Sequence, residues 1–109
     1  MKGDLEIRVS NQAGVVVVSL IGEARADSDA EELDRVQAMH PETVIIDASE
    51  LTFLASTGMR LLVHFQRAIT AYGGALRIAG LRPQVERALH EARLLHLFDV
   101  RPDVGSAIR

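Results

Sequence analysis

Residues 44–63 constrain the fold of this chain more than any other stretch. Residues 44–46 read Val-Ile-Ile, a consecutive apolar run typical of a central strand that is covered on both faces. A connection at 48–55 then leads to Ser-Thr-Gly at 56–58, where a helix with one apolar side is expected to begin. Within that connection, three apolar residues are expected to be tucked under the sheet edge: Leu51, Phe53 and Leu54. A buried strand followed by a helix indicates an α/β fold.

The rest of the chain continues this alternation of short strands and helices. Alternating apolar residues at 5–10 and a β-branched run at 15–21 predict two antiparallel strands joined by a turn at 11–14. Further strands are expected at 43–47, 76–79 and 97–100, and helices from a cap at 27–29 to about 39, from about 56 to 72, at 83–92 and, short or frayed, at 102–109. The spacing predicts that the second helix buries Leu62, Phe65, Ile69 and Tyr72, and the third Val85, Ala88, Leu89 and Ala92. Strands separated by helices favour parallel neighbours. We therefore expect a single α/β domain over residues 1–109, with a mixed sheet of four to five strands in the order β-β-α-β-α-β-α-β-(α).

The acidic residues between 27 and 34 raise the question of a metal site. Hard cations need converging oxygen ligands, often on a glycine-containing loop, and this segment has no glycine. Asp27, Ser28 and Asp29 instead suit the N-cap and first turn of a helix. The segment is therefore interpreted as helix capping and a solvated face, and no metal is expected.

Composition excludes several classes of function. The chain of 109 residues has no cysteine, so disulfides, thiolate zinc sites and thiol catalysis are ruled out. A net charge of −3 argues against a general nucleic-acid binder. No apolar segment is long enough for a membrane span, and residues 1–9 lack the apolar core of a signal peptide. We expect a cytoplasmic protein without direct membrane insertion.

Ser56 invites comparison with a hydrolase serine, because it lies where a strand meets a helix. Such a serine needs a histidine base, usually oriented by a carboxylate. The local sequence Leu-Ala-Ser-Thr-Gly is not the G-x-S-x-G elbow. His64 is two turns away on the same predicted helix, His40 suits a C-cap, and His90 and His96 belong to the last helical region. Neither standard phosphate-binding loop occurs, so no enzyme activity or cofactor is expected.

Two interpretations of the Ser-Thr-Gly segment remain open from the residues alone. Serine and threonine are favoured N-caps, which typically contribute about 1 kcal/mol. The free N–H groups of a helix N-terminus also favour an added phosphate, and phosphorylation would bring about −1.5 to −2 charges to that surface. Arg60, four residues after Ser56, could pair with such a phosphate.

The stretch resembles the core motif of STAS domains, the family of bacterial anti-sigma factor antagonists. In these domains a buried strand ending in Asp leads through an L-x-F-x-D-S-[ST]-G segment into a helix. The matching residues are Asp47, Leu51, Phe53, Ser56, Thr57 and Gly58. Gly73-Gly74, Pro83-x-Val85 and Leu94-x-x-Leu97-Phe98 are also similar, so that the resemblance extends from Leu5 to about Val100.

The resemblance implies a STAS-like fold and a role as a binding partner in transcription, without catalysis. Family members bind an anti-sigma factor that is also a serine-protein kinase of the histidine-kinase-like ATPase fold; phosphorylation of the domain ends binding. Carried over, Ser56 is the phosphoacceptor. Thr57, Gly58 and Met59 are part of the docking surface, and Ala55 and Glu23 lie at the same face.

Two positions depart from the family pattern. Ala55 stands where many members carry Asp, and Gly-Glu at 22–23 is followed by Ala-Arg where Leu-Asp is frequent. An alternative function is therefore a STAS accessory or scaffold subunit that is not phosphorylated, for example in a lipid-transport ABC complex. Such a subunit would use the helix face formed by Met59, Arg60, Val63 and Arg67.

Overall fold

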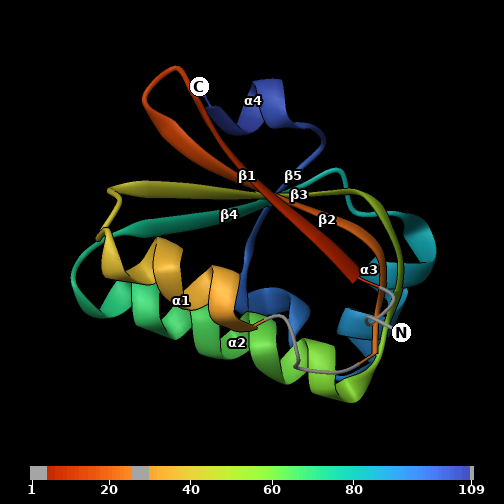
Figure 1. The fold of residues 1–109 in the computed structure, drawn as a ribbon. Helices are drawn as coiled ribbons and strands as arrows, with labels where there is room; N and C mark the ends of the chain where they lie inside the picture. Colours follow the sequence, from red (N-terminus) through yellow and green to blue (C-terminus); the bar gives the residue numbers. More distant parts are fainter. Residues whose placement is uncertain (1–4, 26–29, 109) are drawn as a thin grey trace.

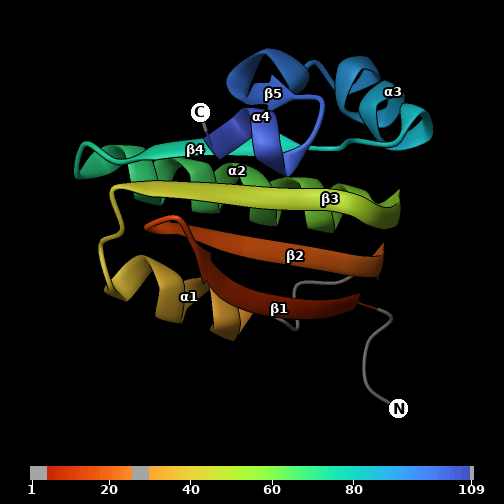
Figure 2. The ribbon, with the colours of Figure 1, turned by 90° about the horizontal axis from the view of Figure 1, so that it is seen from above.

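Five strands lie side by side in the order in which they occur in the chain, as Figure 2 shows. The computed structural model describes residues 5–25 and 30–108, and all bounds here refer to those ranges. The strands are β1 (Leu5–Gln12), β2 (Val15–Ala24), β3 (Thr43–Leu54), β4 (Ala75–Ala79) and β5 (Asp99–Arg101). The helices are α1 (Ala30–Ala38), α2 (Ser56–Ala71), α3 (Pro83–Glu91) and α4 (Val104–Ile108), with a 3-10 turn at Leu95–Leu97. The predicted α/β fold and its element order are confirmed.

The sheet is mixed because only its first connection is a hairpin. Ala13 and Gly14 both have positive φ, 54° and 80°, as a two-residue hairpin turn requires. β1 therefore pairs antiparallel with β2. The three other pairings are parallel, with a helix in each crossover. Parallel strands bring their carboxyl ends to one edge of a sheet, which places the ends of β2 and β3 side by side.

The two faces of the sheet are covered unequally. Figure 1 shows α1 and α2 against one face and the short α4 against the other. The first face carries the main core, built by Val18, Leu20, Val44, Ile46, Leu76 and Ile78 of the strands with Leu33, Val36, Leu62, Phe65, Ile69, Val85 and Leu89 of the helices. On the opposite face a small cluster packs Ala107 against Val17, Ile45 and Ala79. Because residues 44–46 alternate between these clusters, the whole run is buried, as predicted.

β3 is longer than the sequence pattern predicts. Residues 48–54 are strand and not a connection, because β2 also continues, to Ala24, and offers a parallel partner as far as Leu54. The pairing is irregular after Ser19 and again after Gly22. At the first irregularity, the Asp47 carboxylate accepts hydrogen bonds from the Ser49 N–H and hydroxyl. Leu51 and Leu54 are buried as expected, but Phe53 is 41% exposed.

Smaller differences concern the ends of other elements. Residue 97 belongs to the 3-10 turn, and the last strand begins at Asp99. Ala92 follows α3 and is exposed, whereas Val85 and Leu89 are buried as predicted. The N-cap expected at Asp27, Ser28 and Asp29 lies outside the described residues. Tyr72, expected on the apolar side of the second helix, follows α2, and its hydroxyl donates a 2.8 Å hydrogen bond to the Pro41 carbonyl oxygen.

Candidate functional site

The candidate site is the corner where the carboxyl ends of β2 and β3 meet the first turn of α2. Ala24 and Leu54 are the last residue pair of the parallel ladder. The next N–H group, that of Ala55, donates a 2.9 Å hydrogen bond to the Ala24 carbonyl oxygen. The Met59 N–H then donates to the Ala55 carbonyl oxygen at 2.9 Å and starts the helix. Backbone bonds alone therefore fix where α2 begins.

Gly58 allows the helix to approach β2 closely. A Cβ at this position would lie 2.7 Å from the Ala24 carbonyl oxygen and 2.9 Å from both the Ala24 Cβ and the Leu54 Cδ1. Contacts below 3 Å to backbone atoms force the surroundings to shift, so the close approach requires glycine. Gly58 was predicted to be part of a docking surface; in the structure it is buried and sets the distance between α2 and β2.

The serine and threonine do not cap the helix. The N-cap is Ala55, which has extended backbone angles and makes no side-chain cap hydrogen bond. The capping interpretation of Ser56 and Thr57 is therefore wrong, because both residues already lie within the first helical turn. The Thr57 hydroxyl instead donates a hydrogen bond to the Arg25 carbonyl oxygen. It joins the helix to the chain leaving β2.

The start of α2 keeps its hydrogen-bond donors available. Ser56 is exposed, and within the described part of the chain its hydroxyl and the N–H groups of residues 56–58 make no hydrogen bond. The first N–H groups of any helix lack a partner in the helix itself. Together with the helix dipole they favour a negatively charged group at this end. The corner can therefore accept an anion attached to Ser56.

A patch of three side chains lies on the strand side of the corner, where the Thr57 hydroxyl reaches the Arg25 carbonyl oxygen. The Arg25 guanidinium lies 4.6 Å from the centre of the Phe53 ring, within the range of a cation–π interaction. The Arg25 Nε also donates a 2.6 Å hydrogen bond to the Glu23 carboxylate. Glu23 is opposite Phe53 in the parallel register. We call Glu23, Arg25 and Phe53 the strand patch.

The predicted docking residues spread from this corner along α2 and differ in exposure: Val63 and Arg67 lie about two and three turns beyond the start of the helix. Ala55, Thr57, Met59 and Val63 are half-buried, as is Glu23, while Ser56, Arg60 and Arg67 are exposed. The structure brings Glu23 of β2 next to the first turn of α2 through the Ala24–Leu54 pair. Arg25 and Phe53 were not assigned to the site from the sequence. Arg25 could have been found, because it follows Glu23 by two residues and so shares its side of an extended chain.

No histidine serves Ser56 as a base. Among residues 5–25 and 30–108, the Ser56 hydroxyl forms no hydrogen bond to a histidine. His64 lies eight positions further along α2, which is about 12 Å along a helix axis. His40 follows α1 with φ of 49° and contacts the Tyr72 ring at 4.6 Å. His90 and His96 line a shallow depression with Glu91, Arg93 and Leu95.

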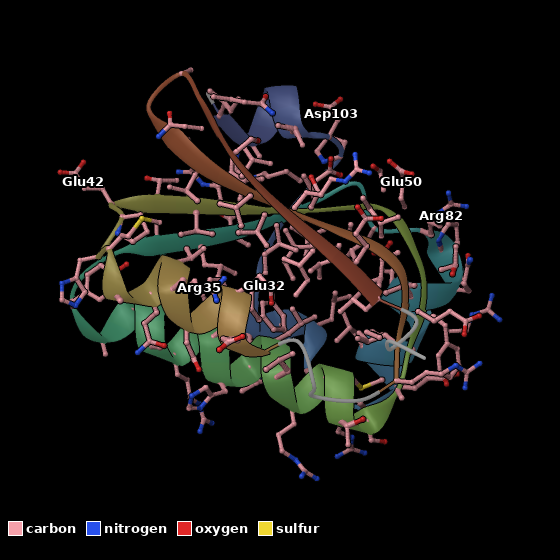
Figure 3. The ribbon with its side chains drawn as sticks, in the orientation of Figure 1. Glu32, Arg35, Glu42, Glu50, Arg82 and Asp103 are labelled. Atoms are coloured by element: carbon pink, nitrogen blue, oxygen red, sulfur yellow. The ribbon has the colours of Figure 1, made fainter. Side chains whose placement is uncertain are left out.

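The described residues contain no group of three His, Asp or Glu side chains placed to hold a metal ion. Two acidic residues of α1 lie on its exposed side, and one of them, Glu31, forms an ion pair with Arg35 at 3.6 Å. Figure 3 shows Glu32 and Arg35 on this helix. No helix in the described ranges is both long and apolar enough to cross a membrane.

Comparisons with known proteins agree on one family. The family model described as STAS domain matches residues 6–107, which is nearly the whole chain. The anti-sigma F factor antagonist of Paenibacillus polymyxa is 24% identical over 109 residues, with 96% of this chain and 93% of the relative covered. An anti-sigma factor antagonist from Mycobacterium paratuberculosis has a similar structure, with a TM-score of 0.85, 26% identity, and 95% and 91% of the two chains covered.

Two further solved structures share the fold at lower identity. The Bacillus cell fate determinant SpoIIAA in its phosphorylated form gives a TM-score of 0.72 at 18% identity, covering 94% of this chain and 96% of SpoIIAA. The STAS domain of a SulP transporter from Vibrio cholerae gives a TM-score of 0.68 at 16% identity, covering 91% of this chain and 81% of the transporter domain. At these identities the likeness concerns the fold alone.

Proposed function

The chain belongs to the STAS domain family, and we propose that it is an anti-sigma factor antagonist that is switched by phosphorylation of Ser56. Its partner is an anti-sigma factor with serine-protein kinase activity, of the histidine-kinase-like ATPase fold. The domain itself is a substrate and a binding partner without catalytic activity. It works in the cytoplasm, where binding to the anti-sigma factor releases a sigma factor for transcription.

The single observation that carries the proposal is the state of Ser56 at the start of α2. Its hydroxyl is exposed, and it is not engaged in capping the helix. A kinase can therefore reach the hydroxyl without breaking a hydrogen bond among the described residues. The family membership and the antagonist relatives support the choice of partner.

A phosphate on Ser56 would change the corner electrostatically and not by refolding it. The added group carries about −1.5 to −2 charges and lies beside the free N–H groups of the first turn. These donors stabilise the phosphate in place. The Glu23 carboxylate of the strand patch is already paired with the Arg25 guanidinium. A partner surface that complements the unmodified corner then meets an unfavourable charge, and binding is lost.

The proposed docking surface combines the first turns of α2 with the strand patch. Thr57, Met59 and Val63 supply half-buried contact area. Arg60 supplies an exposed positive charge one turn after Ser56. Ala55 removes a bulky or charged neighbour from the acceptor, so the partner approaches Ser56 over a small side chain. Phe53 and Arg25 are of the residue types enriched at protein interfaces.

The test is a kinase assay with the cognate anti-sigma factor and ATP. We expect one phosphate, located on Ser56 by mass spectrometry. Ser56→Ala should accept none and should still bind, while Ser56→Asp should bind more weakly. Thr57→Ser is the matched control, because it keeps a hydroxyl next to the acceptor and should leave phosphorylation at Ser56. Phosphate on another residue would refute the assignment.

A second candidate function is an accessory or scaffold subunit that is not phosphorylated. Ala55 favours it, because the acidic neighbour that many family members carry before the serine is absent. The STAS domain of a SulP transporter from Vibrio cholerae has the same fold, which is compatible with this second function. Stable co-purification with a transporter ATPase subunit, unchanged by Ser56→Asp, would favour this function over the first.

A further inference from the structure

We propose that two copies of this chain associate by antiparallel pairing of their β1 strands, with Ile7 on the two-fold axis. The sheet would then continue from one copy into the other. This interface uses the outer edge of β1, whose first residue Leu5 pairs with Gly22 near the end of β2, and it does not depend on phosphorylation. Three features of β1 support it: its length, the direction of its free backbone groups and the order of its charges.

β1 is a long strand with one edge unused. It has eight residues, and among residues 5–25 and 30–108 its only strand partner is β2. Figure 2 shows it as the outermost strand on its side of the sheet. An unpaired edge of this length offers a row of N–H and C=O groups to another strand. The opposite edge differs, because β5 has only three residues.

The hairpin turn determines which backbone groups of β1 are free. The two-residue turn at Ala13 and Gly14 closes on the pair Gln12 and Val15. In an antiparallel ladder, pairs that exchange hydrogen bonds alternate with pairs that do not. Counting back from the turn, the backbone groups of Asn11, Val9, Ile7 and Leu5 point away from β2. A second strand must therefore pair through these residues, of which Leu5, Ile7 and Val9 carry the apolar side chains.

The side chains of the same three residues favour a partner strand. They face the side of the sheet that carries the helices, where Leu5 and Ile7 pack against the main core. Val9 is 44% exposed. With Ile7 opposite its counterpart, Val9 of each copy lies opposite Leu5 of the other. The apolar row of β1 is then continued across the interface and Val9 loses its exposure.

The charges of β1 select this register. Glu6 and Arg8 lie on the other face of the strand and form an ion pair with each other. With Ile7 on the axis, Glu6 of each copy is opposite Arg8 of the other, and opposite charges at such positions stabilise a pair of strands. A slip by two residues in either direction places Glu6 opposite Glu6 or Arg8 opposite Arg8. Both alternatives are destabilising.

Charged residues on an edge strand often serve to prevent pairing. That role fits β5, where Asp99 is held by Arg77 and Arg101 of its own chain. It fits β1 less well, because two opposite charges two residues apart are complementary to a copy of themselves. The partner that this edge fits is therefore a second copy of the chain.

The experiment is sedimentation equilibrium on the full chain over a wide concentration range. We expect a reversible dimer. Arg8→Glu should raise its dissociation constant by about tenfold or more, because both cross-strand pairs become repulsive. Glu6→Arg combined with Arg8→Glu should restore the dimer, since it exchanges the charges and recreates both pairs. A chain that stays monomeric up to about 1 mM, near the weak end of specific affinities, overturns the proposal.

Disulfide trapping tests the register separately, because the chain has no cysteine of its own. Ile7→Cys should form a disulfide-linked dimer, since the two positions are opposite each other. Val9→Cys is the matched control: its two copies would be about 14 Å apart, beyond disulfide reach. A mixture of Leu5→Cys and Val9→Cys should cross-link. If Arg8→Glu left the dissociation constant of the dimer unchanged, the interface would lie elsewhere. Equal yields of disulfide-linked dimer from Ile7→Cys and Val9→Cys would lead to the same conclusion.

Discussion

Gly58 lies so close to Ala24 that a Cβ at position 58 would meet the Ala24 carbonyl oxygen at 2.7 Å. The same carbonyl oxygen accepts the hydrogen bond of Ala55. One backbone group of β2 therefore fixes both the start of α2 and its distance from the sheet. The predictions at the corner follow from this arrangement.

Gly58→Ala should destabilise the protein by about 1–3 kcal/mol, the range for overpacking a close contact. The new methyl group meets backbone atoms that cannot move without disturbing the end of β2. Urea unfolding measures the effect. Gly105→Ala is the control, since its Cβ would contact only the Asp103 carboxylate, at 3.4 Å. That change should leave stability equal or raise it by up to about 1 kcal/mol. Equal effects of both variants would contradict the close approach.

Thr57→Val should lower the free energy of unfolding by about 0.5–1.5 kcal/mol, because it removes the hydrogen bond to the Arg25 carbonyl oxygen. Valine keeps the size of threonine, so packing changes little. Thr57→Ser keeps the hydroxyl and should lose less. Thermal unfolding of the three proteins gives the comparison. A serine variant as unstable as the valine variant would mean that the methyl group matters and the hydrogen bond does not.

Phe53→Ala should separate binding from stability. The ring is 41% exposed and stacks with Arg25, so its removal should cost no more than about 1 kcal/mol of stability. Phe53 is an exposed aromatic residue of the proposed docking surface, so its removal should weaken binding to the anti-sigma factor by about tenfold or more. Met39→Ala removes an exposed apolar side chain after α1 and should not alter binding. Calorimetric titration distinguishes these outcomes.

Asp99 should make the protein less stable in acid. The hydrogen bond from Arg101 holds the pKa of the Asp99 carboxyl below its ordinary value. A lowered folded-state pKa gives stability that is present above the unfolded pKa of about 4 and is lost as pH falls through the folded pKa. The side chain is 46% exposed, so the effect should stay below about 1 kcal/mol. Urea unfolding of Asp99→Asn should show a weaker loss of stability between about pH 5 and pH 2.

Tyr72 should titrate above the ordinary pKa of a tyrosine. Burial raises the pKa of its hydroxyl, which also donates to the Pro41 carbonyl oxygen. A raised folded-state pKa gives stability that is present below the unfolded pKa of about 10 and is lost as pH rises through the folded pKa. Tyr72 is the only tyrosine and there is no tryptophan. The ultraviolet absorbance of the phenolate therefore reports this group alone, and a midpoint at or below about 10 would contradict its burial.

The fold was largely predictable because its signals are local. Three consecutive β-branched residues at 44–46 indicate a strand covered on both faces, and the structure buries all three. Helical spacing identified Leu62, Phe65 and Ile69 as the buried side of α2. The turn between β1 and β2 follows from glycine at position 14, where φ is positive.

The parts that were mispredicted depend on partners distant in the chain. Residues 48–54 mix polar and apolar side chains, and they form a strand only because β2 extends beside them. The helix begins without a capping side chain because the Ala24 carbonyl oxygen fixes the Ala55 N–H. The stacking of Arg25 on Phe53 depends on an irregular parallel register. Local propensity describes none of these contacts.

The alanine at the N-cap of α2 affects how a partner distinguishes the unmodified protein from the proposed Ser56-phosphorylated form. A carboxylate at position 55 would strengthen the helix by about 1 kcal/mol, but it would also place a permanent negative charge beside Ser56. With alanine as the N-cap, position 55 carries no charge in either form. The chain gives up some stability at this position, and the two proposed forms then differ in whether a negative charge is present beside Ser56, and not in how much charge has been added to one already there.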